Sequence, residues 1–195
     1  LWVLRKQPSI SPYVYMIGMA VCDIITSFCT GVNGLMLFYP FLRSSGWLRV
    51  FTIRAQIPVY YARNFTGNAA TYIANALSLD RLIAIRYPMH RALYCTTRRA
   101  RICCVVLFFI CAGMNCDMLL RLTTVTEAGI PIRQYTSIGQ DEMVNKVVLN
   151  LRFILQQLLP LVLMIITNTW TIYEIAKGMK LRSKLSDRTK NPDVQ

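Results

Sequence analysis

Charged residues that interrupt or border long apolar segments are the side chains with the clearest chemistry. Asp80 and Arg81 are adjacent, where an apolar segment meets a basic loop. An acid and a guanidinium at a membrane edge can form an ion pair that opens or closes with conformation, so they are a candidate switch. Adjacent helical residues point in different directions and cannot form an i,i+4 pair. The alternative is an arginine that extends toward the lipid headgroups.

Asp23 lies in the middle of another apolar segment. A carboxylate is costly inside a membrane and usually faces a polar partner, water or an ion, which favours a functional role. Asn33, Asn75 and Asn168 could supply polar partners. The alternative is a protonated Asp23 that is hydrogen-bonded to neighbouring helices.

Pro160 interrupts the last long apolar segment, which has no charged residue around it. Proline lacks an N–H group and bends a helix, and membrane helices tolerate it where neighbouring groups satisfy the freed carbonyl. The bend is either a pivot for a conformational change or a packing kink. The sequence does not separate these two interpretations.

Residues typical of enzymes and metal sites do not form a pattern in this chain. A Ser-His-Asp set, a phosphate-binding glycine loop and a carboxylate pair are all missing, so we expect no catalytic activity. One histidine and seven cysteines, most of them in apolar segments, have no zinc-ligand spacing. The cysteines are interpreted as small buried hydrophobic residues.

The elements that must hold these residues are membrane helices. The chain has 195 residues, 54% of them hydrophobic, and a formal net charge of +13. A nucleic-acid-binding protein can be equally basic, but it would place its arginines on a polar face rather than between apolar segments. Four apolar segments reach the roughly 20 residues that a membrane helix needs, which predicts an all-α membrane protein. The predicted helices cover residues 12–40, 54–86, 100–122 and 146–178.

Lysine and arginine in the loops predict the orientation, because basic loops stay on the cytoplasmic side. Basic residues collect in the loop after Arg81 and again beyond residue 178, whereas acidic residues dilute them between residues 122 and 146. Asp80 and Arg81 are therefore expected at the cytoplasmic end. Residues 179–195 are expected to form a basic cytoplasmic tail, which can also attract anionic membrane lipid.

Several short motifs in these segments resemble class A, rhodopsin-like G-protein-coupled receptors. Each motif is weak alone, but they occur in the family's order. In chain order they are Met19 to Asp23 for the second helix, Leu79 to Pro88 for the third, and Pro160, Met164 and Asn168 for the fifth.

The resemblance implies that residues 1–195 form helices two to five of a seven-helix receptor bundle, as part of a longer multi-pass protein of the plasma membrane. It also implies that Asp23 lines a sodium pocket, which is the only cofactor expected. In the family, the arginine contacts its neighbouring acid in the resting state. The implied activation switch comprises Asp80, Arg81, Pro160 and Asn168, and the implied G-protein-facing surface comprises Arg81, Arg86, Pro88, Met89 and Arg91.

Four positions depart from the family pattern, among them Leu82 in place of a tyrosine and Phe108 in place of a tryptophan. Asn168 replaces the usual tyrosine of the fifth helix, which resembles some invertebrate neuropeptide receptors of the FMRFamide-receptor-like group. Gln56 occupies the place of the cysteine that usually ties the third helix to the second outer loop, and residues 122–146 contain no cysteine. We therefore expect that loop to lack a covalent tie, with a less fixed ligand pocket.

The position at which amine receptors carry an aspartate is Arg63. A cation there repels an amine and favours an acidic ligand or a peptide with an acidic group. The alternative is that Arg63 pairs with an acid elsewhere or extends toward the headgroups. The resemblance places the extracellular ligand, which we expect to be a peptide, near Arg63, Asn64, Gly67, Asn68 and Gln156.

Two other functional classes compete with a receptor that signals to a heterotrimeric G protein. A voltage-sensing or channel module would carry arginines at every third position of one apolar helix, whereas Arg98, Arg99 and Arg101 cluster at a helix entrance. A structural four-helix membrane scaffold would be expected to have a large outer loop with cysteines. No nucleic-acid partner is expected.

Overall fold

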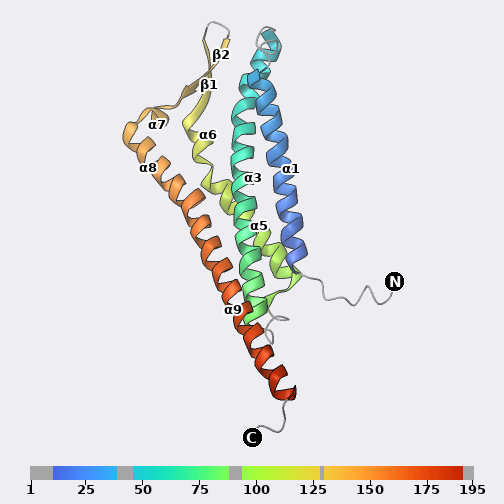
Figure 1. Ribbon diagram of the computed structural model, residues 1–195. Helices are drawn as coiled ribbons and strands as arrows, with labels where there is room; N and C mark the ends of the chain where they lie inside the picture. The colour runs from blue at the N-terminus through green and yellow to red at the C-terminus, as the bar shows by residue number, and fades with distance from the viewer. Residues whose placement is uncertain (1–10, 39–45, 88–93, 128–129, 191–195) are drawn as a thin grey trace, which may run out of the picture.

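The computed structural model describes residues 11–38, 46–87, 94–127 and 130–190. They form long helices, and a β-hairpin lies at one end of the bundle (Figure 1). The chain begins its first helix at the end opposite the hairpin, and the last helix returns to that end. The helical elements are α1 (Ser11–Phe38), α3 (Gly46–Arg86), α5 (Thr97–Met114), α6 (Asp117–Arg121), α7 (Ser137–Gln140), α8 (Glu142–Arg152), the π-helix η3 (Phe153–Leu158) and α9 (Leu159–Lys190).

These helices form the all-α membrane architecture that the sequence predicted, a partial seven-helix bundle. The second helix begins at Gly46, before the predicted residue 54. The last stretch is continuous from Glu142 through α8, η3 and α9 to Lys190, so it extends the predicted helix in both directions. Asp141 explains its start, since the carboxylate accepts hydrogen bonds from the backbone N–H groups of Met143 (2.9 Å) and Val144 (3.3 Å).

α3 is the central helix and packs against α1, α5 and α9. Among the described residues, three helical stretches are long and apolar enough to cross a membrane: Ser11–Leu35, Thr97–Arg121 and Glu142–Lys180. α3 is not one of them, although the sequence analysis counted four apolar segments of sufficient length. Its central position gives the reason, because a helix surrounded by other helices can carry polar side chains that lipid would not tolerate.

Small residues form much of the core between α1, α3 and α5. The buried cluster contains Tyr15, Cys22, Ala69, Ile73, Leu77, Ala100 and Cys111. Small side chains let helix backbones approach closely, which is the main source of packing between membrane helices. None of the seven cysteines forms a disulfide. Cys22, Cys29 and Cys111 are buried as predicted, whereas Cys116 is exposed and the other three are partly buried. Large apolar side chains such as Phe28, Phe109 and Ile172 are exposed on the outer surface, where lipid would cover them.

The loop between α6 and α8 contains an antiparallel hairpin that the sequence did not predict. β1 (Leu122–Glu127) pairs with β2 (Ile130–Tyr135), from Leu122 opposite Tyr135 to Glu127 opposite Ile130. The backbone N–H of Thr136 donates to the carbonyl of Arg121 (3.0 Å), which closes the base of the hairpin. Backbone hydrogen bonds therefore hold together the loop in which the sequence shows no disulfide.

Gly139 of α7 fits against this base. A Cβ atom at position 139 would lie 2.6 Å from the carbonyl oxygen of Arg121, closer than real Cβ contacts allow. Only glycine permits this approach without a backbone shift. The glycine thus lets α7 pack against the base of the hairpin.

Candidate functional site

Asn115 is fully buried and joins four segments of the chain at the hairpin end of the bundle. Its Oδ1 atom accepts hydrogen bonds from Arg152 Nη2 (3.1 Å), Gln156 Nε2 (3.3 Å) and Asn68 Nδ2 (3.4 Å). Its own Nδ2 donates to the carbonyl of Cys111 (2.7 Å). A buried amide that uses both its oxygen and its nitrogen fixes the relative position of the elements it joins.

The end of α5 gives Asn115 its position. α5 stops at Met114, and Asn115 is its C-terminal cap, with φ −103° and ψ 0°. The backbone then turns, because Cys116 N–H donates to the carbonyl of Gly113 (3.1 Å) and Met118 N–H donates to that of Asn115 (3.1 Å). α6 begins directly after this turn, so the interruption brings Asn115 and Asp117 to the same end of the bundle.

Asp117 lies between two arginines next to this amide. Its carboxylate oxygens are 3.5 Å from Arg152 Nη2 and 3.6 Å from Arg121 Nη1. Neither oxygen accepts a hydrogen bond from the part of the chain that the structure describes, and the Nε atoms of both arginines also lack a hydrogen-bond partner there. The group therefore has one more positive charge than negative charge and unused hydrogen-bonding capacity.

A cavity of about 220 Å³ opens beside this ion-pair group, between α3, α6, α8 and the hairpin. Arg63 is one helical turn from the cavity wall, and its guanidinium stacks over the Tyr60 ring at 4.9 Å, a distance typical of a cation–π contact. Three cations, Arg63, Arg121 and Arg152, thus gather at this end of the bundle. The cavity is lined by Tyr60, Asp117, Met118, Arg121, Leu122, Tyr135, Leu149 and Arg152.

Only some of the residues predicted to contact a ligand lie together. Asn68 and Gln156 meet at Asn115. Asn64 donates to the carbonyl of Tyr60 in its own helix (2.7 Å). Gly67 lies against α1, since a Cβ atom there would be 3.9 Å from Thr26 Cγ2, so it belongs to a helix contact rather than to the cavity lining.

The π-helix η3 stands directly before Pro160, and its hydrogen bonds explain a contact with α3. Leu159 N–H donates to the carbonyl of Ile154, five residues back. The next bond in that pattern would run from position 160 to Leu155, but proline has no N–H. The hydroxyl of Tyr72 donates to the Leu155 carbonyl instead. A side chain of the central helix thus satisfies the group that Pro160 leaves free.

At the opposite end of the bundle, which we call the Asp80 end, Asp80 has a hydroxyl partner. Ser11 Oγ of α1 donates to Asp80 Oδ2 (2.6 Å), and the Cys95 thiol donates to the Asp80 carbonyl (3.6 Å). Arg81 is exposed. Across the described ranges no cation is ion-paired with Asp80, so the contact expected between Asp80 and Arg81 is not formed in this conformation.

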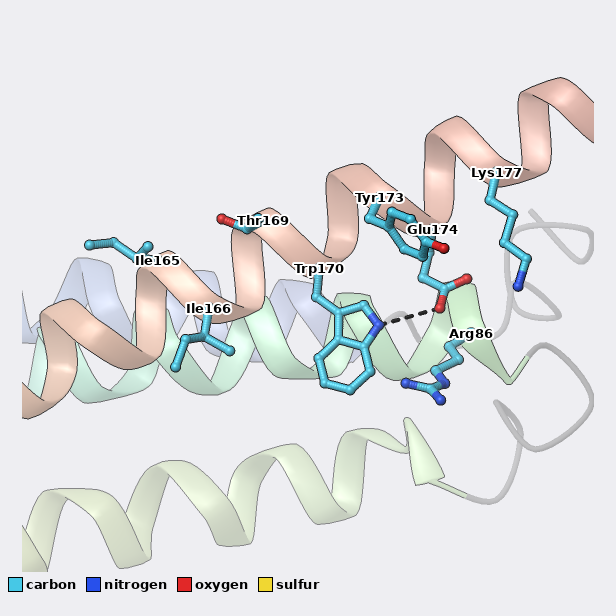
Figure 2. Close-up of a pocket in the computed structure, with 8 residues that line it drawn as sticks. All are labelled: Arg86, Ile165, Ile166, Thr169, Trp170, Tyr173, Glu174 and Lys177. Atoms are coloured by element: carbon cyan, nitrogen blue, oxygen red, sulfur yellow. Dashed lines mark hydrogen bonds between the residues drawn. The ribbon is translucent and has the colours of Figure 1, made fainter.

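Arg86 connects α3 to α9 at the Asp80 end. Its guanidinium lies 4.7 Å from the centre of the Trp170 ring, and Trp170 Nε1 donates to Glu174 Oε1 (3.3 Å) (Figure 2). Sequence analysis had named Arg86 but not Trp170. Pro88, Met89 and Arg91 lie outside the described residues. Arg86 and Trp170 border a cavity of about 760 Å³. Its lining comprises Arg86, Ile165, Ile166, Thr169, Trp170, Tyr173, Glu174 and Lys177.

Asp23 and Asn168 are both exposed in this structure. Asn75, one of the side chains expected near Asp23, is buried and donates to the Thr71 carbonyl (3.1 Å), while its Oδ1 has no partner among the described residues. The structure therefore does not assemble a closed polar pocket around Asp23 from the part of the chain that it describes.

Sequence analysis missed several residues of these sites: Tyr60, Asn115, Asp117, Arg121 and Trp170. One available signal was the polar run at the end of the third apolar segment, where Asn115 and Asp117 lie within an otherwise apolar stretch. Polar side chains at such depth usually face other helices. For Trp170 the sequence offered no such signal, because an aromatic residue in a membrane segment is common.

Residues 1–192 match the family described as 7 transmembrane receptor (rhodopsin family). No curated protein matches the chain. The match covers the helices that hold the Asn115 cluster and the helices that meet at the Asp80 end.

Proposed function

This chain belongs to the rhodopsin family of seven-transmembrane receptors. From that premise we propose that it is part of a receptor that binds an extracellular peptide and signals to a heterotrimeric G protein. Members of this family are multi-pass plasma-membrane receptors and not enzymes. The four long helical stretches supply part of the bundle. The family match disfavours the channel and scaffold alternatives.

The observation that carries the ligand proposal is the hydrogen-bonded cluster at Asn115. It brings together Asn68 and Gln156, two of the residues expected to meet a ligand, and adds Arg152. Arg63 lies on the same helix as Asn68, so the hairpin end is both rich in hydrogen-bonding groups and cationic. This combination supports a peptide with an acidic group and disfavours an amine.

The proposed mechanism links this cluster to the Asp80 end through α3 and the last helical stretch. Asn68 and Gln156 share one acceptor at the hairpin end, Tyr72 bonds to Leu155 in the middle, and Arg86 stacks on Trp170 at the other end. An agonist that binds better to one arrangement of these helices shifts the population toward it.

The interruption of regular helical hydrogen bonds at η3 and Pro160 provides a place where α9 can swing relative to α8. In the proposal, this swing separates α9 from α3 at the Asp80 end and opens space beside the exposed Arg81 for a G protein. Asn168, one residue before the cavity-lining Thr169, would move with it. The neuropeptide-receptor subtype and a sodium ion near Asp23 belong to the proposal as finer details, supported by the motif matches alone.

The test is agonist-dependent nucleotide exchange on purified G proteins by the complete receptor in nanodiscs, with pools of peptides that end in an acid or carry an acidic side chain. We expect exchange with such a pool and little with amines. Conductance recordings on the same nanodiscs address the channel alternative. Peptide-independent currents without nucleotide exchange would contradict the proposal.

A further inference from the structure

We propose that the 220 Å³ cavity at the hairpin end is a carboxylate subsite, which takes a carboxylate of the extracellular ligand together with the apolar group attached to it. This inference rests on the proposed receptor function for its biological meaning. It concerns chiefly Arg121 and Arg152, which face the same carboxylate.

The charges favour an anion. Two guanidiniums face one carboxylate, at 3.6 Å and 3.5 Å, and Asp117 forms no hydrogen bond to either of them. The side chains of Arg121 and Arg152 are only 14% and 22% exposed, so water does not readily replace the missing partners. Guanidinium donors form their strongest bonds with carboxylates, often in a paired geometry. A second carboxylate would satisfy donors that Asp117 leaves unused.

The size and lining of the cavity define what accompanies the carboxylate. Pockets that enclose a whole drug-sized ligand have volumes of roughly 300 Å³ or more, so a cavity of about 220 Å³ fits one end of a peptide. Tyr60 and Tyr135 contribute rings to the lining, and Met118, Leu122 and Leu149 contribute apolar surface. An aromatic or aliphatic residue with a free carboxylate matches both features.

Arg152 connects this cavity to the Asn115 cluster. The same Nη2 atom lies 3.1 Å from Asn115 Oδ1 and 3.5 Å from Asp117 Oδ1. A ligand carboxylate that draws Arg152 toward the cavity would weaken one of these contacts. Binding in the cavity is thereby coupled to the position of η3, which meets Asn115 through Gln156.

A minimal probe tests the subsite without knowledge of the natural ligand. Sodium benzoate has the required carboxylate and ring, and benzamide has the same shape without the charge. We expect benzoate to raise the midpoint of thermal unfolding of the complete receptor in nanodiscs in a saturable manner, compared with sodium chloride at equal ionic strength. Benzamide should have no such effect. Equal effects of the two compounds would overturn the proposal.

Variants then assign the effect to the two arginines. Arg121→Gln and Arg152→Gln should each weaken benzoate binding at least about tenfold, as expected when a hydrogen bond to a charged group is lost. Arg121→Lys retains the charge and should keep part of the affinity, which separates binding from a loss of folding. Lys146→Gln is the matched control, because Lys146 is an exposed cation on α8 that pairs with Glu142 at 2.7 Å.

Asp117→Asn provides the sharpest test, because it removes the competing internal carboxylate. Benzoate should then bind about tenfold more tightly, since two like charges no longer share the site. Weaker or unchanged binding in Asp117→Asn would show that the group is only a structural ion pair and overturn the proposal. Failure of G-protein coupling with intact benzoate binding would contradict the proposed function and leave the subsite in place.

Discussion

The two ends of the bundle are held together in different ways. At the hairpin end a single buried amide, Asn115, receives three donors from other segments, and Asp117 adds two ion pairs. At the Asp80 end, two contacts between helices share no residue, namely Ser11 with Asp80 and Arg86 with Trp170. In a hydrogen-bond network, the loss of one member weakens the others, and the network therefore favours a single arrangement of the helices. Separate pairs can break independently of one another. The comparison indicates that rearrangement costs least at the Asp80 end.

Removing the shared acceptor should give the largest effect. In Asn115→Leu, three donors lose their partner within a buried site, and we expect the free energy of unfolding to fall by about 3 kcal/mol. Chemical denaturation of the complete receptor in mixed micelles measures this loss. Asn150→Leu is the control, since Asn150 is exposed on α8. Equal stability of the two variants would show that the hairpin end is not organised by Asn115.

At the other end we expect a smaller cost in stability but a change in signalling. Asp80→Asn removes the charge that the Ser11 hydroxyl meets at 2.6 Å, and a loss of about 1 kcal/mol in the resting state corresponds to roughly a fivefold change in the population ratio. Basal nucleotide exchange should rise accordingly, measured at matched receptor concentration. Glu142→Gln, an exposed carboxylate at the hairpin end, should leave it unchanged.

In the middle of the bundle, a single substitution should lower the free energy of unfolding by the contribution of one hydrogen bond. Tyr72→Phe leaves the Leu155 carbonyl without its hydroxyl donor, and we expect a loss of about 1 kcal/mol in the free energy of unfolding. Tyr13→Phe alters an exposed tyrosine and serves as the reference. A negligible difference between these two variants would mean that the Leu155 carbonyl does not need the Tyr72 hydroxyl as a donor.

The smallest expected effect is the coupling between Arg86 and Trp170. A cation–π contact at a partly exposed site contributes about 0.5 to 1 kcal/mol. A double-mutant cycle with Arg86→Gln and Trp170→Leu, read from chemical denaturation, should return a coupling of this size. Arg86 with Tyr173, another residue of the same cavity wall, is the comparison pair. Zero coupling for Trp170 would remove the contact from the mechanism.

Hydrophobic segment length predicted the four long helical stretches, because membrane helices must satisfy their backbone groups internally. It did not predict the hairpin of Leu122–Tyr135. The two strands are short, and their weak alternation of polar and apolar residues looks like the sequence of a loop. It also overestimated how apolar α3 is, because segment patterns do not show which helix occupies the centre.

Motif matches found Asp80 and Arg81 and, through spacing, Asn68 and Gln156. They could not find Asn115 or Asp117, which reach the cluster because α5 ends at Met114 and the chain turns. They also could not show that Gly67 faces α1. Contacts between helices depend on rotation about each helix axis, and a motif on one helix does not fix that rotation.

The π-helix before Pro160 determines the direction in which each following side chain of α9 points around the helix axis. One residue of an α-helix corresponds to a rotation of about 100°, and a π-turn absorbs one extra residue. If η3 relaxed to ordinary α-helical winding while α8 stayed fixed, Thr169 or Thr171 would stand opposite Arg86 in place of Trp170. The winding of the six residues Phe153–Leu158 therefore determines which side chain of α9 Arg86 contacts at the Asp80 end.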